Sequence, residues 1–229
     1  IRKISPGGEA TTLAGLAGSP GSDDGPGAMA RFNAPRGIAV DGAGNLYVSD
    51  SGNHTVRKIT PAGDVTTLAG MAGAEDYVDG VGTAARFRTP DGIAVDSAGV
   101  IYVIDSYDTP FDHPIRKITP AGVVTTLVRT LYQQFGIAVD GTGNVYVTTY
   151  HAVRKITPAG LITVLAGSTK LSTCSEPLSS SLLCYYDSGS LDGLGAAARF
   201  NWPAGVALDG AGNLYVADRF NHTVRKLSP

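Results

Sequence analysis

The stretch from Pro35 to Lys58 reads PRGIAVDGAGNLYVSDSGNHTVRK, and it decides the fold. Its short apolar runs, such as GIAV and LYV, are rich in Val, Ile and Tyr and are bounded by Gly, Asp and Asn. This pattern predicts β-strands joined by tight turns. The DGAG segment between the first two runs has the Asp and Gly that hairpin turns need. With VTTLAG, which follows at Val65 to Gly70, the stretch predicts a four-stranded antiparallel meander.

The same pattern returns along the whole chain. The run GIAVD begins at Gly37, Gly92 and Gly136, and its variant GVALD begins at Gly205. Repeated meanders that bury both faces against their neighbours are typical of β-propellers. The sequence therefore predicts an all-β propeller of about four four-stranded antiparallel blades, forming one domain over 1–229. The expected parts are a partial blade at 1–15, repeats at about 32–70, 87–128, 131–167 and 200–229, and an insertion at 168–199.

Both ends of the sequence carry the third strand of the repeat. IRKIS opens the chain at Ile1, and VRKLSP closes it at Val224 to Pro229. The opening residues are neither an initiating Met nor a signal peptide, so we expect the chain to be processed or excised from something longer. Propellers can remove exposed edges by pairing their terminal strands, but this closure leaves one copy of the third strand over. We expect a larger propeller, or pairing of the surplus strand with another chain to give a multimer or fibre.

The consensus of these units resembles the NHL repeat over nearly the whole chain; it reads P-x-G-I-A-V-D-x-x-G-N-L-Y-V-x-D-x-x-N-H-x-V-R-K. Three further segments, which we call the Asp-Gly segments, read DGPGAMARF, DGVGTAARF and DGLGAAARF. They are similar to segments of bacterial secreted members of that family. The resemblance implies a propeller, often with six blades. The third unit departs from the pattern, because RTLYQQFG replaces the Asp-Gly segment and TTYHA replaces D-x-x-N-H.

Composition narrows the class of partner. A formal net charge of −2 and a pI of about 6.1 lack the basic footprint that nucleic acid requires. No apolar run approaches the roughly 20 residues that cross a bilayer. Cys174 and Cys184 predict a local disulfide, since no other Cys and no His lies near them in the sequence to complete a metal site. That pair suggests an extracellular or cell-surface location.

Two residue types recur once in each repeat. The four histidines share one frame: His54, His113, His151 and His222. A single catalytic site would not need one histidine per blade, so we interpret them as structural residues that bind backbone groups. The third strands also carry one arginine each: Arg57, Arg116, Arg154 and Arg225. A cation between packed blades needs a partner, and the expected neighbours are the arginines of the ARF triplets or Asp50, Asp105 and Asp218, with solvent exposure as the alternative.

Variable loops predict where a ligand binds. The turns between strands one and two and between strands three and four are short and alike, whereas the loops at the other face differ in length and sequence. Their aromatic side chains, with acidic neighbours, suit a protein or carbohydrate ligand. The candidate binding residues are Tyr107, Asp108, Phe111, Tyr150, Tyr185, Tyr186 and Phe220, with Asp112 as a further polar neighbour. These features favour an extracellular binding or assembly module that needs no cofactor.

The alternative is an extracellular metal-dependent hydrolase or lyase, because some propellers that resemble this one are lactonases or lyases. Such enzymes gather carboxylates at the mouth of the central channel, where this sequence has Arg36, Asp91, Phe135 and Ala204. One carboxylate in four does not make a calcium shell of six to eight oxygens. The Asp-Gly segments could also bind calcium, although Asp-Gly is foremost a turn signal. The carboxylates they offer are Asp23, Asp24, Asp79 and Asp192. The sequence leaves catalysis open, and no catalytic residue is assigned.

Overall fold

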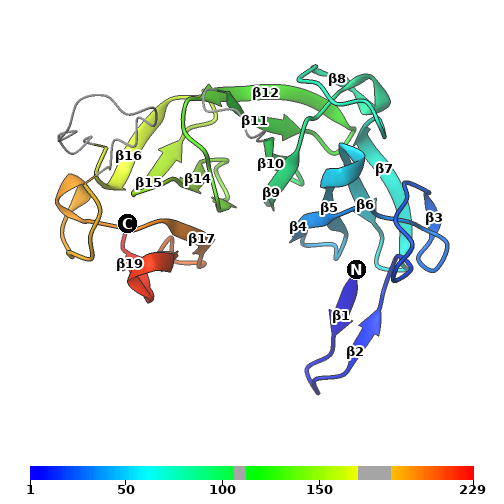
Figure 1. The fold of residues 1–229 in the computed structure, drawn as a ribbon, viewed down its shortest axis with the longest axis horizontal. Helices are drawn as coiled ribbons and strands as arrows, with labels where there is room; N and C mark the ends of the chain where they lie inside the picture. Colours follow the sequence, from blue (N-terminus) through cyan, green and yellow to red (C-terminus); the bar gives the residue numbers. More distant parts are fainter. Residues whose placement is uncertain (106–111, 170–186) are drawn as a thin grey trace, which may run out of the picture. The chain divides into compact units, whose positions relative to one another are not determined.

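The computed structural model of the protein describes residues 1–105, 112–169 and 187–229. They form two compact units, Ile1–Thr130 and Leu131–Pro229. Every regular element within the described residues is a β-strand or a 3-10 helix of three residues (Figure 1). The predicted all-β class, with antiparallel propeller blades, is therefore confirmed. In this described part of the chain, no helix has the length and apolar character needed to cross a membrane.

Unit 1 contains a hairpin and two blades. The hairpin pairs β1 (Arg2–Ile4) with β2 (Ala10–Thr12). Blade one has the strand order β3-β7-β6-β5-β4, from β3 (Gly25–Pro26), β4 (Pro35–Val40), β5 (Leu46–Asp50), β6 (Thr55–Ile59) and β7 (Asp64–Gly70), with η1 (Ser51–Asn53) before β6. Blade two has the order β8-β12-β11-β10-β9, from β8 (Gly80–Val81), η2 (Gly82–Ala84), β9 (Pro90–Val95), β10 (Ile101–Asp105), β11 (His113–Ile118) and β12 (Val123–Thr130). Each blade thus gains a short fifth strand, β3 or β8, from its Asp-Gly segment.

Unit 2 contains two further blades. Blade three has the order β13-β14-β15-β16, from β13 (Ile137–Val139), β14 (Val145–Thr148), β15 (Ala152–Ile156) and β16 (Ile162–Gly167). Blade four has three strands, β17 (Pro203–Leu208), β18 (Leu214–Asp218) and β19 (Thr223–Leu227), with η3 (Gly195–Ala197) before them and η4 (Arg219–Asn221) before β19. In the described residues β1 pairs with β2 and β19 pairs with β18. Closure by terminal strands, and one domain over 1–229, stay predictions.

The second strands of blades one, two and three are largely buried on both faces. Successive side chains of a strand point to opposite sides of its sheet. In β5, Tyr47 packs against Phe87 and Ile93 in one core cluster, whereas Val48 packs with Phe32 in another. Such strands need apolar residues on both sides, which is why LYV is a continuous apolar run rather than an alternating one. The same layering in unit 2 joins residues of β15, β16 and β18 to the segment before β17.

First strands of neighbouring blades approach each other closely at a glycine. A Cβ on Gly37 would lie 2.3 Å from the carbonyl oxygen of Asp91, and a Cβ on Gly136 would lie 2.3 Å from that of Ala204. Any larger residue would therefore push the two blades apart. At Gly37 and Gly136 the glycine is a requirement of packing between blades, whereas a Cβ on Gly205 would have its nearest neighbour, the Cβ of Ala217, at 4.0 Å.

A buried arginine joins the strands of blade one to its Asp-Gly segment. Arg57 on β6 is fully buried and donates to Asp50 on β5 at 2.9 Å and to Asp24 at 2.6 Å. Its guanidinium also lies 5.1 Å from the ring centre of Phe32 and donates to the Arg31 carbonyl oxygen. We call this set of contacts the arginine site of a blade. In blades two and four it consists of Arg116 with Asp105, Asp79 and Phe87, and of Arg225 with Asp218, Asp192 and Phe200.

The predicted pairing of the arginines with the aspartates of strand two is confirmed in these three blades. Blade three differs because Thr149 stands in the position of the aspartate. There Arg154 lies 4.1 Å from the ring centre of Tyr132, so a cation–π contact replaces the contact with a phenylalanine of the Asp-Gly segment.

Removing the carboxylate of one arginine site should destabilise the protein strongly. We expect Asp105→Ala to lower the free energy of unfolding by about 3 kcal/mol, because Arg116 would stay buried with one of its two carboxylates gone. The matched control is Asp91→Ala, which breaks the exposed Arg36–Asp91 pair and should cost no more than about 1 kcal/mol. Urea unfolding of both variants tests the difference, and equal costs would contradict it.

The turn between strands one and two of a blade, which is distinct from the Asp-Gly segment, is also stabilised by hydrogen bonds to an aspartate carboxylate. In blade three, Asp140 accepts hydrogen bonds from the backbone N–H groups of Thr142 and Asn144 and from the Tyr146 hydroxyl, the last at 3.0 Å. Burial opposes the charge, but hydrogen bonds from Asn144 and Thr142 outweigh it and lower the pKa of Asp140. Burial, then the hydrogen bond to Asp140 and its negative charge, raise the pKa of Tyr146 to about 12.

This tyrosine should make stability depend on alkaline pH. The folded-state pKa of about 12 lies above the ordinary tyrosine pKa of 10.0, so the contribution is complete below pH 10 and is lost as the pH rises towards 12. Tyr146→Phe should unfold at a lower temperature than the natural chain at pH 8, and the gap should close towards pH 12. Thermal unfolding across this range measures it; a constant gap would contradict the linkage.

Candidate functional site

Four aromatic side chains meet at the loop face of unit 2. Phe135 precedes β13, Tyr150 lies between β14 and β15, Trp202 precedes β17, and Phe220 lies in η4. The ring centres of Tyr150 and Trp202 are 4.9 Å apart, and Phe135 lies 5.4 Å from Trp202. The ring of Phe220 lies 5.8 Å from that of Trp202. We call these four residues the aromatic cluster, and Trp202 is its centre.

Backbone hydrogen bonds between the loops hold the cluster in place. The N–H of Trp202 donates to the carbonyl oxygen of Tyr150 at 2.9 Å, and that of Phe220 donates to Asn201 at 3.0 Å. The Tyr150 hydroxyl donates to the Gln133 side chain at 3.2 Å. Trp202 has a φ of 53°, a left-handed conformation that non-glycine residues adopt infrequently. The backbone therefore sets where the indole stands.

The repeat itself does not require these rings. In blade one, Ala34 occupies the position of Trp202 with nearly the same φ of 47°, and Gly52 occupies the position of Phe220. Both blades form although the side chains differ this much. All four members of the cluster remain partly or largely exposed, and Phe220 is 48% exposed. An exposed group of large apolar side chains that the scaffold does not need is a candidate binding surface.

Arg219 adds a positive charge beside the cluster. Its guanidinium lies 5.0 Å from the ring centre of Phe220. An arginine next to aromatic rings resembles the composition of binding hot spots, in which Trp, Tyr and Arg are enriched. The surface thus offers apolar area with one cationic donor at its side.

The structure describes some of the predicted binding residues and not others. Tyr150 and Phe220 both belong to the aromatic cluster. Asp112 forms an ion pair with Arg129 at 2.5 Å in unit 1. The predicted binding residues Tyr107, Asp108, Phe111, Tyr185 and Tyr186 lie outside the described residues, as do Cys174 and Cys184, whose disulfide stays a prediction.

Sequence reasoning missed Trp202 as a site residue and noted Phe135 only at the channel mouth. One signal was available: alignment of the repeats places Trp202 opposite Ala34 and Phe135 opposite Arg36. A large aromatic side chain at a position where another repeat has a small or a charged one indicates an addition to the scaffold.

The histidines have different environments. The Nδ1 atom of His54 lies 2.5 Å from the carbonyl oxygen of Arg88, and that of His151 lies 3.3 Å from the carbonyl oxygen of Phe200. Burial lowers the pKa of His113 and of His151. His54 and His222 cap η1 and η4 in a left-handed conformation, with φ of 58° and 57°. These contacts are those of residues that shape the loop between strands two and three.

The carboxylates considered for calcium have other partners. Asp24, Asp79 and Asp192 bind the arginines of their arginine sites, and the backbone oxygen of Asp23 accepts from Arg57. At the channel mouth, Arg36 and Asp91 form an ion pair at 3.3 Å. Within the described ranges no group of three or more His, Cys, Asp or Glu side chains could hold a metal ion.

The sequence profile of the NHL repeat matches residues 32–59 and 200–227, which lie in blades one and four. The chain carries NHL repeats. Relatives of this NHL-repeat protein include Protein SUPPRESSOR OF QUENCHING 1, chloroplastic, of Arabidopsis thaliana, 28% identical over 233 residues, or 94% of this chain and 22% of that protein. NHL repeat-containing protein 2 of Bos taurus is 32% identical over 124 residues, or 53% of this chain and 16% of that protein. The NHL chain thus spans about a fifth of the length of these curated relatives.

Solved structures share the propeller fold with this NHL chain. An auxiliary nutrient binding protein from Bacteroides ovatus matches with a TM-score of 0.58 and 16% identity, covering 100% of this chain and 58% of that chain. A streptogramin B lyase matches with a TM-score of 0.57 and 13% identity, covering 90% of this chain and 55% of that chain. At this identity the likeness shows the fold alone.

The aromatic cluster should contribute much less to the stability of the protein than the buried core does. We expect Phe220→Ala to change the free energy of unfolding by less than about 0.5 kcal/mol, because its ring is half exposed and the equivalent residue in blade one is Gly52. Phe200→Ala, which removes a ring that is 2% exposed, should cost about 3 to 5 kcal/mol. Chemical denaturation of the two variants makes the comparison. A large cost at Phe220 would mean that the cluster is part of the scaffold.

Proposed function

We propose that the chain is a non-enzymatic recognition module and that the aromatic cluster of unit 2 is its ligand site. The observation that carries this proposal is the set of partly exposed rings at positions where blade one has Ala34 and Gly52. NHL propeller scaffolds support a binding or scaffold role. The scaffold supplies rigid loop ends, and the added side chains supply apolar area.

A protein partner fits the cluster best, and a carbohydrate is the second ligand class. Edge-to-face rings such as Tyr150 and Trp202 present both ring edges and ring faces to a partner, and Arg219 can donate several hydrogen bonds beside them. Rigid aromatic groups lose little conformational entropy on binding. An apolar side chain or a sugar face that stacks on the cluster would bury this area.

An extracellular or cell-surface location is part of the proposal. It is supported by Cys174 and Cys184, which would form a disulfide only in an oxidising compartment. The similarity of the Asp-Gly segments to those of bacterial secreted proteins supports the same location.

Ligand binding should depend on Phe220. A peptide display library and a glycan array supply candidate ligands, and the dissociation constant of each ligand found is measured with the purified chain. We expect Phe220→Ala to weaken binding at least tenfold, which corresponds to about 1.4 kcal/mol.

The matched control is Leu161→Ala, which removes another exposed apolar side chain of unit 2, beside the turn between β15 and β16. It should leave binding within twofold. Ligands that bind the Phe220 variant unchanged would place their site elsewhere and refute the role of the cluster. The single Trp, at the centre of the cluster, provides a fluorescence signal for the titration.

The alternative function, an extracellular metal-dependent hydrolase or lyase, draws support from the fold shared with a streptogramin B lyase. Assaying a panel of lactones with added Ca²⁺ or Mg²⁺ distinguishes the two. Turnover that a chelator abolishes would favour the enzyme over the recognition module.

A further inference from the structure

The rings of the aromatic cluster touch one another edge to face. The ring centres of Phe135 and Tyr150 are 5.6 Å apart and their planes cross at 78°, and the planes of Tyr150 and Trp202 cross at 80°. Phe220 lies at 64° to Trp202. Rings in such contact leave no slot between them for a single anchoring side chain. Ring edges and ring faces alternate instead, so a ligand that covers the cluster lies across several rings.

The polar groups beside the rings are hydrogen-bond donors. The indole Nε1–H of Trp202 can only donate, and it forms no hydrogen bond with any other residue that the structure describes. The Oε1 atom of Gln133 accepts from the Tyr150 hydroxyl at 3.2 Å, which leaves the Nε2 group of Gln133 to donate. The carbonyl oxygen of Tyr150 already accepts from the N–H of Trp202, and that of Asn201 accepts from Phe220. A ligand that matches these groups brings acceptors rather than donors.

A proline-rich segment in the polyproline II conformation has this combination of properties. Proline has a backbone carbonyl but no N–H, so a run rich in proline offers acceptors with few donors. The polyproline II helix has no internal hydrogen bonds, which leaves its carbonyls free to accept. An α-helix, by contrast, uses its carbonyls internally, and a strand without proline brings one N–H per residue. Grooves lined by aromatic residues are a recurring surface for proline-rich segments.

Proline rings also suit the apolar part of the surface. The face of an aromatic ring carries partial negative charge and attracts the polarised C–H groups of a proline ring. Both partners are stiff before they meet. The polyproline II helix is a preformed conformation, and backbone hydrogen bonds between the loops hold Trp202 at a φ of 53°. Little conformational freedom is therefore lost on binding, so a shallow surface of four rings is sufficient.

We propose that the aromatic cluster binds a proline-rich polyproline II segment of a partner protein, whose carbonyls accept from Trp202 Nε1 and Gln133 Nε2. Proline rings of the segment lie on the faces and edges of the four aromatic rings. This inference rests on the proposed function, because it names the ligand class of the same site. A peptide without proline and a neutral sugar are the competing ligands.

Peptide titration tests the ligand class. One set of synthetic peptides has about ten residues with proline at every third position, which places the prolines on one edge of a polyproline II helix. A matched set has alanine in place of each proline. Isothermal titration calorimetry with the purified chain measures the dissociation constants. We expect the best proline peptides to bind at least tenfold more tightly than their alanine counterparts, and Phe220→Ala to remove this preference.

Two changes test the donors without removing a ring. Trp202 is the single Trp of the chain, so growth of a tryptophan auxotroph on benzothienylalanine replaces this residue alone and removes its N–H while keeping its shape. Gln133→Glu keeps an acceptor for the Tyr150 hydroxyl and removes the Nε2 donors. We expect each change to weaken binding of the proline peptide at least fivefold, with an unchanged unfolding temperature.

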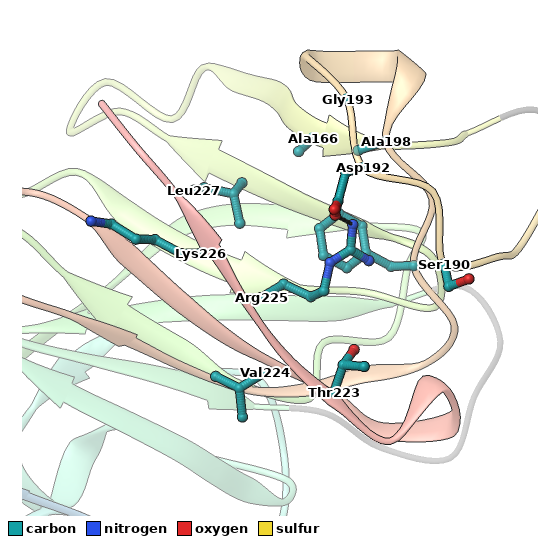
Figure 2. A pocket seen from close by; sticks show the side chains of 11 residues that line it. Ala166, Ser190, Asp192, Gly193, Ala198, Thr223, Val224, Arg225, Lys226 and Leu227 are labelled. Carbon is teal, nitrogen blue, oxygen red and sulfur yellow. Dashed lines mark hydrogen bonds and ion pairs between the residues drawn. The ribbon is translucent and has the colours of Figure 1, made fainter.

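The matched control for Gln133→Glu is Ser190→Asp, which adds the same charge to unit 2. Ser190 lines a pocket of about 470 Å³ to which none of the four rings contributes (Figure 2). This variant should bind the proline peptide within twofold of the natural chain. Equal affinity for the proline and alanine peptides, or unchanged affinity after both donor changes, would overturn the proline-rich ligand.

The outcomes also separate this inference from the function on which it rests. A peptide without proline, or an oligosaccharide from the glycan array, that binds only while Phe220 is present would overturn the proline-rich ligand and leave the recognition module standing. Proline peptides that bind the Phe220→Ala variant as well as the natural chain would overturn the site proposed for them. If every ligand found were indifferent to Phe220→Ala, both proposals would fail.

Discussion

The ion pair between the arginine of strand three and the aspartate of strand two is the interaction on which blades one, two and four depend. Moving a guanidinium group from water into the protein interior costs free energy unless its N–H groups donate to acceptors there. In blade one, Arg57 meets this demand with Asp50, Asp24 and backbone oxygens, and Phe32 lies over it. These partners come from strand β5 and from the Asp-Gly segment that precedes β4 in the sequence. The arginine therefore ties together parts of the chain that sheet hydrogen bonds alone would not join.

Because these contacts fix the backbone, the side chains of the loop face can vary from blade to blade. Because the strands, the Asp-Gly turns and the arginine sites determine the backbone, side chains just before strand one can differ without disturbing the blade. Ala34 and Trp202 share a left-handed backbone conformation although their side chains differ greatly in size. The aromatic cluster lies at positions where the blades form with different side chains. A binding surface can be added there at little cost in stability.

Blade four has the same arrangement, with one difference in exposure. Its arginine site already holds Arg225 between Asp218 and Asp192, yet the arginine is 12% exposed where Arg57 and Arg116 are fully buried. In blades one and two the fourth strand both covers the arginine and donates to the outer aspartate.

By itself, the sequence determined the strands and the turns, and it indicated Asp50 as a candidate partner of Arg57, because the repeat places an Asp and an Arg in adjacent strands. It did not show that Asp24 and Asp79 belong to the arginine sites, since an Asp-Gly pair looks the same in a turn or a calcium loop. Nor did it bring Phe135, Tyr150 and Trp202 together. Their contacts join two blades across long separations in sequence, so only the packing of one blade on the next could decide them.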